Sequence, residues 1–245
     1  MTEGNPGWRK GPATRFVRAL AFAATAAFLA GIVGAGAAIA AGAPTQLVYR
    51  VTHSIYGNIG TYINTVEPVG DDTMVLTRAH FEVSLLGVDV YREDAQRTER
   101  WQGNRLVAFH GVTDRGKGPT EVKGEARGDA FVITSPQGTV DAPATVHPAN
   151  PWSSNFLDSH TMMRPDTGRV ERVKVSAGEP TTVTIGGTPI AARKYDVDGK
   201  TRYTVWLDGR GVPVKFIVED DSGTVTFTLA NCVRCGLDGG RLGEK

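Results

Sequence analysis

The chain has 245 residues, 40% of them hydrophobic and 22% charged, with 30 glycines, which is the composition of a globular protein rather than a disordered one. Its length accommodates one large domain or two small ones, but two separate domains of about 95 residues each would have marginal cores. Residues 1–43 carry four basic residues and one acidic residue, a formal charge of +3. Because the net charge of the whole chain is +1, residues 44–245 carry a charge of about −2. Without an excess of basic residues in this part, a nucleic-acid partner is not expected.

An uncharged stretch rich in Ala and Gly, residues 19–43, follows these basic residues. A basic start, an apolar stretch and a small-residue end are typical of a secretory signal peptide, with Ala38–Ala40 or Ala41–Ala43 as the cleavage site. Because about 20 apolar residues also span a bilayer, the alternative is an uncleaved inner-membrane anchor, with membrane contact through residues 19–43. In either case the positive-inside rule predicts that residues 44–245 are exported to the periplasm.

From Pro44 onward the dominant hydrophobic period is two. Residues 224–229 show it clearly, since Val225, Phe227 and Leu229 alternate with threonines. This pattern is typical of antiparallel strands with one buried face, and turn dipeptides such as Asp198-Gly199 separate the runs at intervals of about 10–12 residues. We therefore expect about ten to twelve strands in a single all-β domain, residues 44–230, followed by a tail, residues 231–245.

Two expectations concern the faces of this sheet. Residues 92–102, "REDAQRTERWQ", are interpreted as a strand with Arg97 and Glu99 on the solvent side. A curved sheet would have a concave side that must be filled by its own side chains or by an apolar guest. The residues expected to line that side are Tyr49, Val51, Phe81, Phe109 and Val175.

The central segment "HPANPWSSNFLDSHTMM", residues 147–163, interrupts the alternation. Pro151 suits the first turn of a short helix, with Asn150 or Ser153 as its cap. The apolar residues would then close one end of the sheet, with Trp152 as the main anchor and Phe156 and Leu157 beside it. The alternative is a mobile flap over a cavity, lined by Trp152 and by the adaptable side chains of Met162 and Met163.

The same segment contains the residue types of an acyl-transfer triad, in Ser153, Ser154, Asp158 and His160. Triad members usually come from separate elements, and the chain has no G-x-S-x-G elbow, so we assign no catalytic residue and keep a hydrolase as an alternative. The five His are dispersed without a metal-binding spacing, and Asp198-Gly199 is explained by a hairpin. We predict no metal and no cofactor.

Cys232 and Cys235, in "NCVRCG", are the only cysteines of the chain. A zinc site would need two further ligands, and a thioredoxin-like redox site would need a following helix that "GLDGGRLGEK" cannot form. A disulfide between the two, formed on export, is the simplest interpretation. Redox chemistry, metal binding and intermolecular pairing are the alternatives.

Three stretches, "YRVTHSIYGNIGTY" (49–62), "PWSSNFLD" with "DTGRVERVKV" (151–175) and "YTVWLDGRGVPVKFIVED" (203–220), resemble a family of bacterial exported proteins of unknown function. The resemblance implies one strongly curved antiparallel sheet, a half-barrel or incomplete barrel similar to lipoprotein carriers, and it transfers no catalytic residue. Together with the apolar concave side, it favours a non-enzymatic binder or carrier of an apolar ligand such as a lipid. The expected ligand contacts are Trp152, Phe156, Met162 and Trp206, and a structural protein-interaction module is a further alternative.

Overall fold

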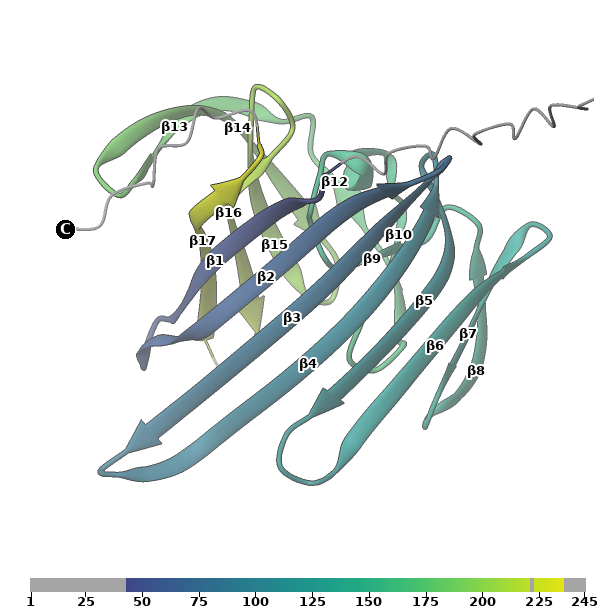
Figure 1. The fold of residues 1–245 in the computed structure, drawn as a ribbon, viewed down its shortest axis with the longest axis horizontal. Coiled ribbons are helices and arrows are strands. Elements are labelled where there is room, and N and C mark those ends of the chain that lie inside the picture. The colour runs from purple at the N-terminus through teal and green to yellow at the C-terminus, as the bar shows by residue number, and fades with distance from the viewer. Residues whose placement is uncertain (1–42, 221–222, 236–245) are drawn as a thin grey trace, which may run out of the picture. The chain divides into compact units, whose positions relative to one another are not determined.

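The computed structural model describes residues 43–220 and 223–235, which are almost entirely β-structure (Figure 1). The predicted N-terminal signal or anchor therefore lies outside the described residues, except for residue 43. Among the residues described, no helix is both long and apolar enough to cross a membrane. The strands are β1 (Thr45–His53), β2 (Gly57–Val69), β3 (Asp72–Leu85), β4 (Val88–Gln102), β5 (Arg105–Asp114), β6 (Pro119–Arg127), β7 (Ala130–Ser135), β8 (Gly138–Pro143), β9 (His147–Pro148), β10 (Thr161–Met163), β11 (Val170–Arg172), β12 (Lys174–Val175), β13 (Glu179–Ile185), β14 (Thr188–Asp198), β15 (Arg202–Asp208), β16 (Pro213–Asp220) and β17 (Gly223–Val233).

Fourteen of these strands form one antiparallel sheet in the order β12-β14-β15-β16-β17-β1-β2-β3-β4-β5-β6-β7-β8, with β13 paired to β14. The strands at the two ends of this path, β12 and β8, are not paired with each other, so the sheet is open. The prediction of one curved antiparallel sheet is confirmed. The expected ten to twelve strands were too few, since the described residues form seventeen; four of these, β9 to β12, have only two or three residues each and show no alternation.

The central segment crosses the inner side of the sheet (Figure 1), and its strands β9 and β10 form a second, three-stranded sheet with β11, which follows the segment in the chain. Successive side chains of a strand point to opposite faces, so neighbouring residues of β10 pack into two different hydrophobic cores. Met162 packs into the core beneath β1, β2 and β14 to β17, and Met163 packs into the core beneath β5 to β8. The segment thus divides the interior of the sheet into two halves.

The expected short helical cap is not what this segment forms. The structure has only a four-residue 3-10 helix, Asn155–Asp158, whose preceding residue Ser154 makes no side-chain capping hydrogen bond. The Ser153 hydroxyl instead accepts a hydrogen bond from the backbone N–H of Asn155 at 3.2 Å. The side chain of Asn150 is buried in the interior and serves another purpose, described below.

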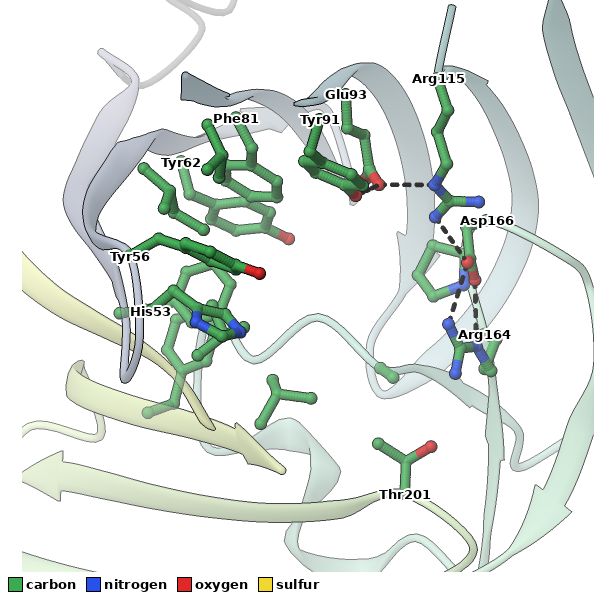
Figure 2. A pocket seen from close by; sticks show the side chains of 18 of the residues that line it. His53, Tyr56, Tyr62, Phe81, Tyr91, Glu93, Arg115, Arg164, Asp166 and Thr201 are labelled. Carbon is green, nitrogen blue, oxygen red and sulfur yellow. Dashed lines mark hydrogen bonds and ion pairs between the residues drawn. The ribbon is translucent and has the colours of Figure 1, made fainter. Parts of the chain in front are cut away.

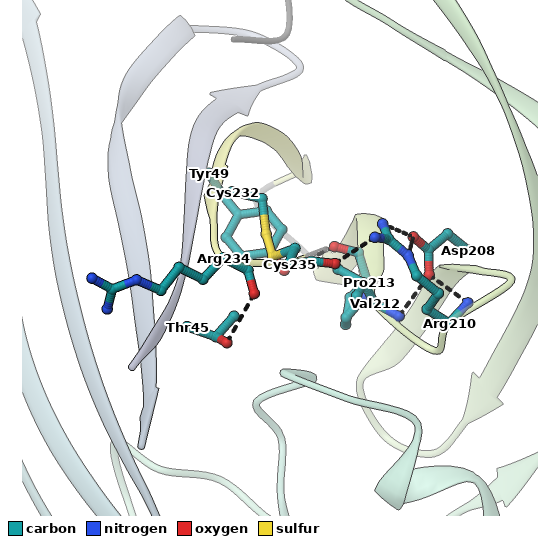
Figure 3. Close-up of a disulfide and its surroundings, with 9 residues drawn as sticks. All are labelled: Thr45, Tyr49, Asp208, Arg210, Val212, Pro213, Cys232, Arg234 and Cys235. Atoms are coloured by element: carbon teal, nitrogen blue, oxygen red, sulfur yellow. Dashed lines mark hydrogen bonds and ion pairs between the residues drawn. A yellow bond between two sulfur atoms is a disulfide. The ribbon is translucent and has the colours of Figure 1, made fainter. Parts of the chain in front are cut away.

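A disulfide joins Cys232 to Cys235 at the end of β17 (Figure 3), as the sequence predicts. The loop that it closes is held by its neighbours. Arg210, in the turn between β15 and β16, donates a hydrogen bond to the Cys235 carbonyl oxygen, and the Thr45 hydroxyl donates to the Arg234 carbonyl oxygen at 3.4 Å. Because Gln46 pairs with Val233, this loop lies beside the beginning of β1.

Candidate functional site

Two charged residues of β4, Arg97 and Glu99, point into the interior. Arg97 is 9% exposed and Glu99 is 0% exposed, so the expectation that they lie on the solvent side was wrong. The buried residues Ala95 and Trp101 occupy odd-numbered positions of β4, as Arg97 and Glu99 do, and they determine which face of β4 is turned to the interior. Because side chains alternate strictly, a strand that buries Trp101 must also bury Glu99 and Arg97.

Glu99 is fully hydrogen-bonded where it lies. Its Oε2 accepts hydrogen bonds from the indole N–H groups of Trp101 at 2.9 Å and Trp152 at 3.1 Å, and its Oε1 accepts one from the Asn150 amide at 2.8 Å. Burial raises the pKa of the Glu99 carboxyl group to about 7, against the opposing effect of these hydrogen bonds and of the Arg97 charge.

Asn150 connects Glu99 to the neighbouring strands. Its Oδ1 accepts hydrogen bonds from the Tyr62 hydroxyl at 2.7 Å and the Asn64 amide at 3.1 Å, and its Nδ2 also donates to the Thr77 hydroxyl at 3.0 Å. We call these residues, with Glu99, Trp101 and Trp152, the Glu99 network. The network holds the central segment against β2, β3 and β4. The hydrogen bond to Glu99 accounts for the position of Trp152, so no ligand contact is needed to explain it.

Next to this network the structure has a partly open pocket of about 640 Å³ (Figure 2), within the usual range for small-molecule sites. One wall is apolar and mostly aromatic. Phe216 and Phe227 stack with ring centroids 4.1 Å apart, and Phe227 also meets Tyr62 and Phe81 edge to face at 5.3 Å and 6.1 Å. Aliphatic side chains complete this wall: Ile59, Val83, Val218 and Val225.

Apolar side chains continue from this wall to the mouth of the pocket. Tyr56, Leu85 and Val90 line the pocket and are at the same time about half exposed. The β3–β4 turn next to them places Leu86, which is completely exposed, at a positive φ of 53°. This conformation is costly for a residue with a Cβ and usually belongs to Gly or Asn. The mouth is therefore more apolar than the needs of the fold explain.

The opposite wall is polar and is built as a chain of hydrogen bonds and ion pairs (Figure 2). Glu93 accepts hydrogen bonds from the Tyr91 hydroxyl at 2.7 Å and from Arg115 at 2.8 Å. Arg115 also donates to Asp166 at 3.0 Å, and Arg164 donates to both oxygens of Asp166 at 3.1 and 2.9 Å. Burial alone would raise the pKa of Asp166, but the two guanidinium groups outweigh it and hold this pKa at about 2.

A glycine lets the loop that carries Arg164 and Asp166 lie against β5. A Cβ at Gly111 would come within 3.0 Å of the Phe109 ring and 3.2 Å of the Pro165 carbonyl oxygen. The absence of a side chain at Gly111 therefore lets the loop with Arg164 and Asp166 approach β5 closely enough to form part of the pocket wall.

Arg97 lies between the Glu99 network and the polar wall, and it lines the pocket. Across the strands it is paired with Thr77 on one side and Gly111 on the other. Its Nη2 is 4.0 Å from Glu93, a long ion pair. Its Nε is buried, and no hydrogen-bond partner for it is found among the described residues.

The four expected ligand contacts do not lie in the lining of this pocket. Phe156 and Met162 are buried in the first core, and both border a separate cavity of only about 20 Å³. Trp152 belongs to the Glu99 network, and Trp206 is half-buried with the Lys215 ammonium group 4.9 Å from its ring centroid. Of the residues expected to line the concave side, Phe81 lines the pocket, whereas Tyr49, Val51 and Phe109 are buried core residues.

The residue types of a triad in the central segment are not assembled into one. The Ser153 hydroxyl is occupied by the Asn155 amide, and the Ser154 hydroxyl lies against Gly211. Within residues 43–220 and 223–235, no hydrogen bond joins either Ser to His160. In the same part of the chain, no group of three His, Cys, Asp or Glu is placed to hold a metal ion.

Most residues of the pocket were missed by the sequence reasoning, although β4 contained a signal. Residues 92–102 carry charges at both parities, with Glu93, Arg97 and Glu99 on one and Arg92, Asp94 and Arg100 on the other. In a sheet with one packed face, such a strand must bury one of its charged sets. Arg115 and Arg164 lie in loops, where no periodicity could have pointed to the pocket.

The fold and the pocket together define an open, barrel-like β protein with a cavity of ligand size. The chain belongs to the family DUF6134, a domain of unknown function, whose model matches residues 49–230. A solved structure with the same fold is the β-barrel-like protein of domain of unknown function DUF1849 from Brucella abortus, with a TM-score of 0.59 at 13% identity over 77% of this chain and 96% of that chain. A search of curated proteins gives no match.

Proposed function

We propose that this protein is an exported, non-enzymatic binder or carrier of an apolar ligand such as a lipid, and that the ligand occupies the pocket between the aromatic wall and the polar wall. The observation that supports this most is the aromatic wall itself. Tyr62, Phe81, Phe216 and Phe227 come from four strands and meet at one open cavity of about 640 Å³. Burying apolar ligand surface there would contribute about 25 cal/mol per Å².

The mouth supports the same function. An apolar ligand must leave a membrane or a partner before it enters the pocket, and an apolar rim lowers the cost of that transfer. Leu86 at the mouth is exposed and held at a positive φ, an arrangement that stability alone does not favour.

The location outside the cytoplasm rests on two observations. The basic residues followed by the uncharged stretch 19–43 are typical of an export signal. The disulfide between Cys232 and Cys235 suits an oxidising compartment such as the periplasm.

The test is native mass spectrometry, with lipid extraction, of the full-length protein purified from the envelope of its own host. We expect a copurified apolar molecule with the wild-type chain and its loss in Val218→Trp, which fills the pocket from its apolar wall. The matched control is Val233→Trp, the same substitution at an exposed position at the far end of β17. Wild-type protein that carries no apolar molecule, or a Val218→Trp variant that retains it while folded, would contradict the proposal.

A further inference from the structure

We propose that the ligand is an amphiphile with one apolar tail and one singly charged anionic head group, a carboxylate in the simplest case, and that Arg97 binds this head group. The inference rests on the proposed function, because it assigns the chemistry of the ligand for the same pocket.

Arg97 is the first reason. Four buried side-chain polar atoms of the described residues have no hydrogen-bond partner, and they belong to Arg97, Arg105, Thr113 and Glu171. Only Arg97 among these residues lines the pocket. A guanidinium group that is 9% exposed, with no partner for its Nε and only a long 4.0 Å ion pair to Glu93, is incompletely compensated for its lost hydration. The Nε itself has almost no accessible surface, so an anionic ligand would pair with the part of the guanidinium group that remains accessible from the pocket and would compensate its charge.

The charge of the polar wall is the second reason. Three guanidinium groups, those of Arg97, Arg115 and Arg164, face two carboxylates, those of Glu93 and Asp166. Arg115 is within 3.0 Å of both carboxylates and Arg164 is within 2.9 Å of Asp166, so these four groups compensate one another. Arg97 is left with its 4.0 Å approach to Glu93 and with the charge interaction between it and Glu99. Among the groups that line the pocket, the surplus is one positive charge. Glu99 lies behind this lining, and its raised pKa of about 7 keeps it partly protonated near neutral pH. This balance matches a monoanion better than a neutral or cationic head group.

The arrangement of the two walls is the third reason. Tyr62 lines the pocket on the aromatic side, and the pKa of its hydroxyl reflects the nearby Arg97 charge, which opposes the rise caused by burial. The cation therefore lies at the boundary between the aromatic wall and the polar wall. A ligand with a head group on Arg97 would place its tail along Phe81, Phe216 and Phe227. Guanidinium groups suit carboxylates because two N–H donors match the two oxygens.

The experiment measures displacement of N-phenyl-1-naphthylamine, a neutral apolar fluorescent probe, from the delipidated full-length protein. The competitors are dodecanoate, 1-dodecanol and dodecylammonium, which have the same number of carbon atoms and carry an anionic, a neutral and a cationic head group. We expect dodecanoate to bind about tenfold more tightly than dodecanol or dodecylammonium. In Arg97→Gln this preference should disappear, while the probe and dodecanol still bind. Arg97→Lys should keep part of it, because it keeps the charge and loses the planar pair of donors.

The matched control is Arg100→Gln, on the same strand but on the outer face, where the side chain is half exposed and 3.7 Å from Asp72; its preference should equal that of the wild type. Circular dichroism checks that each variant is folded. If the probe binds but dodecanoate and dodecanol compete equally, or if Arg97→Gln keeps the preference, the head-group inference fails and the apolar pocket stands. If neither the probe nor any competitor binds the wild type, the proposed function fails as well.

Discussion

Glu99 and Arg97 lie two residues apart on the same face of β4, and both are withdrawn from solvent, yet their surroundings are opposite. Glu99 receives three hydrogen bonds from Asn150, Trp101 and Trp152. Arg97 has a 4.0 Å approach to Glu93 and an Nε without a partner among the described residues. A buried charge is tolerated in a fold when it is paired. The difference indicates that Glu99 serves the architecture, and it is the contrast on which the head-group role proposed for Arg97 rests.

The halves of the interior differ in the same way. On the Glu99 side, the crossing segment and Trp101 fill the space under the sheet with their own side chains. On the Arg97 side, the aromatic wall faces an open cavity. One strand thus borders both a closed core and an open pocket, and variants in the two regions should behave differently.

The largest effect is expected where the network is most connected. Asn150→Ala should reduce the free energy of unfolding by about 4 kcal/mol. Glu99 loses one of its three hydrogen bonds, and the Tyr62 hydroxyl and the Asn64 amide lose their buried acceptor, at about 1–3 kcal/mol each with partial relaxation. Urea denaturation of the variant measures this. Ser153→Ala, in the same segment, should lose less than about 1 kcal/mol. A loss of that small size in Asn150→Ala would mean that the network does not hold the segment.

The next effect is a pH dependence that comes from Glu99. Its pKa is raised by burial to about 7 in the folded protein, against about 4.3 when unfolded. The folded state therefore binds the proton more tightly, and stability falls as the pH rises from about 5 to about 8. The expected loss is about 2–3 kcal/mol.

Glu99→Gln is the control for this pH dependence, since it cannot titrate. Buried His147 has a lowered pKa and so acts with the opposite sign, losing stability as the pH falls. Asp166, with a pKa of about 2, changes only below about pH 4. The quantity to measure is therefore the difference in free energy of unfolding between wild type and Glu99→Gln at each pH. If that difference stays constant from pH 5 to pH 8, Glu99 is ionised throughout.

Two arginines of the pocket should respond with opposite signs. Arg115→Met removes the closest ion-pair partner of buried Glu93 and one of the two guanidinium partners of Asp166, and it should cost about 2 kcal/mol. Arg97→Met removes a buried charge with an unpartnered Nε and should leave the ligand-free protein as stable as the wild type or up to about 1 kcal/mol more stable. Thermal unfolding of delipidated protein compares them. Equal destabilisation by both variants would show that Arg97 is a structural residue like Arg115.

The contrast also explains what the sequence could reveal. The alternation of Val225, Phe227 and Leu229 reflects one packed face, so the curved sheet was predictable from periodicity. The buried charges were not, because charged side chains are nearly always outside, and only the shared parity of Glu99 with Trp101 argued otherwise. The pocket joins β2, β3, β4, β16 and β17 with loops carrying Arg115 and Arg164, and local patterns carry no information on such distant contacts. Asn150 was noticed as a cap, but its true partners lie 51 to 88 residues away in sequence.

The smallest effect is expected for the disulfide, which lies away from both regions compared above. Cys232 and Cys235 are at the end of β17 beside the start of β1, whereas His53 at the other end of β1 lines the pocket. A disulfide stabilises mainly by restricting the unfolded chain, and a bridge between residues three apart closes a very small loop. Contacts from Arg210 and Thr45 also hold this loop without the bridge (Figure 3).

Replacing both cysteines by Ser should therefore change stability by less than about 1 kcal/mol and leave dodecanoate affinity unchanged, as thermal unfolding and probe displacement would measure. Alkylation of the unreduced wild type, which should find no free thiol, verifies that the bridge was present. A large loss of affinity in the double variant would mean that the two ends of β1 are coupled, and the pocket could then no longer be treated as independent of the tail.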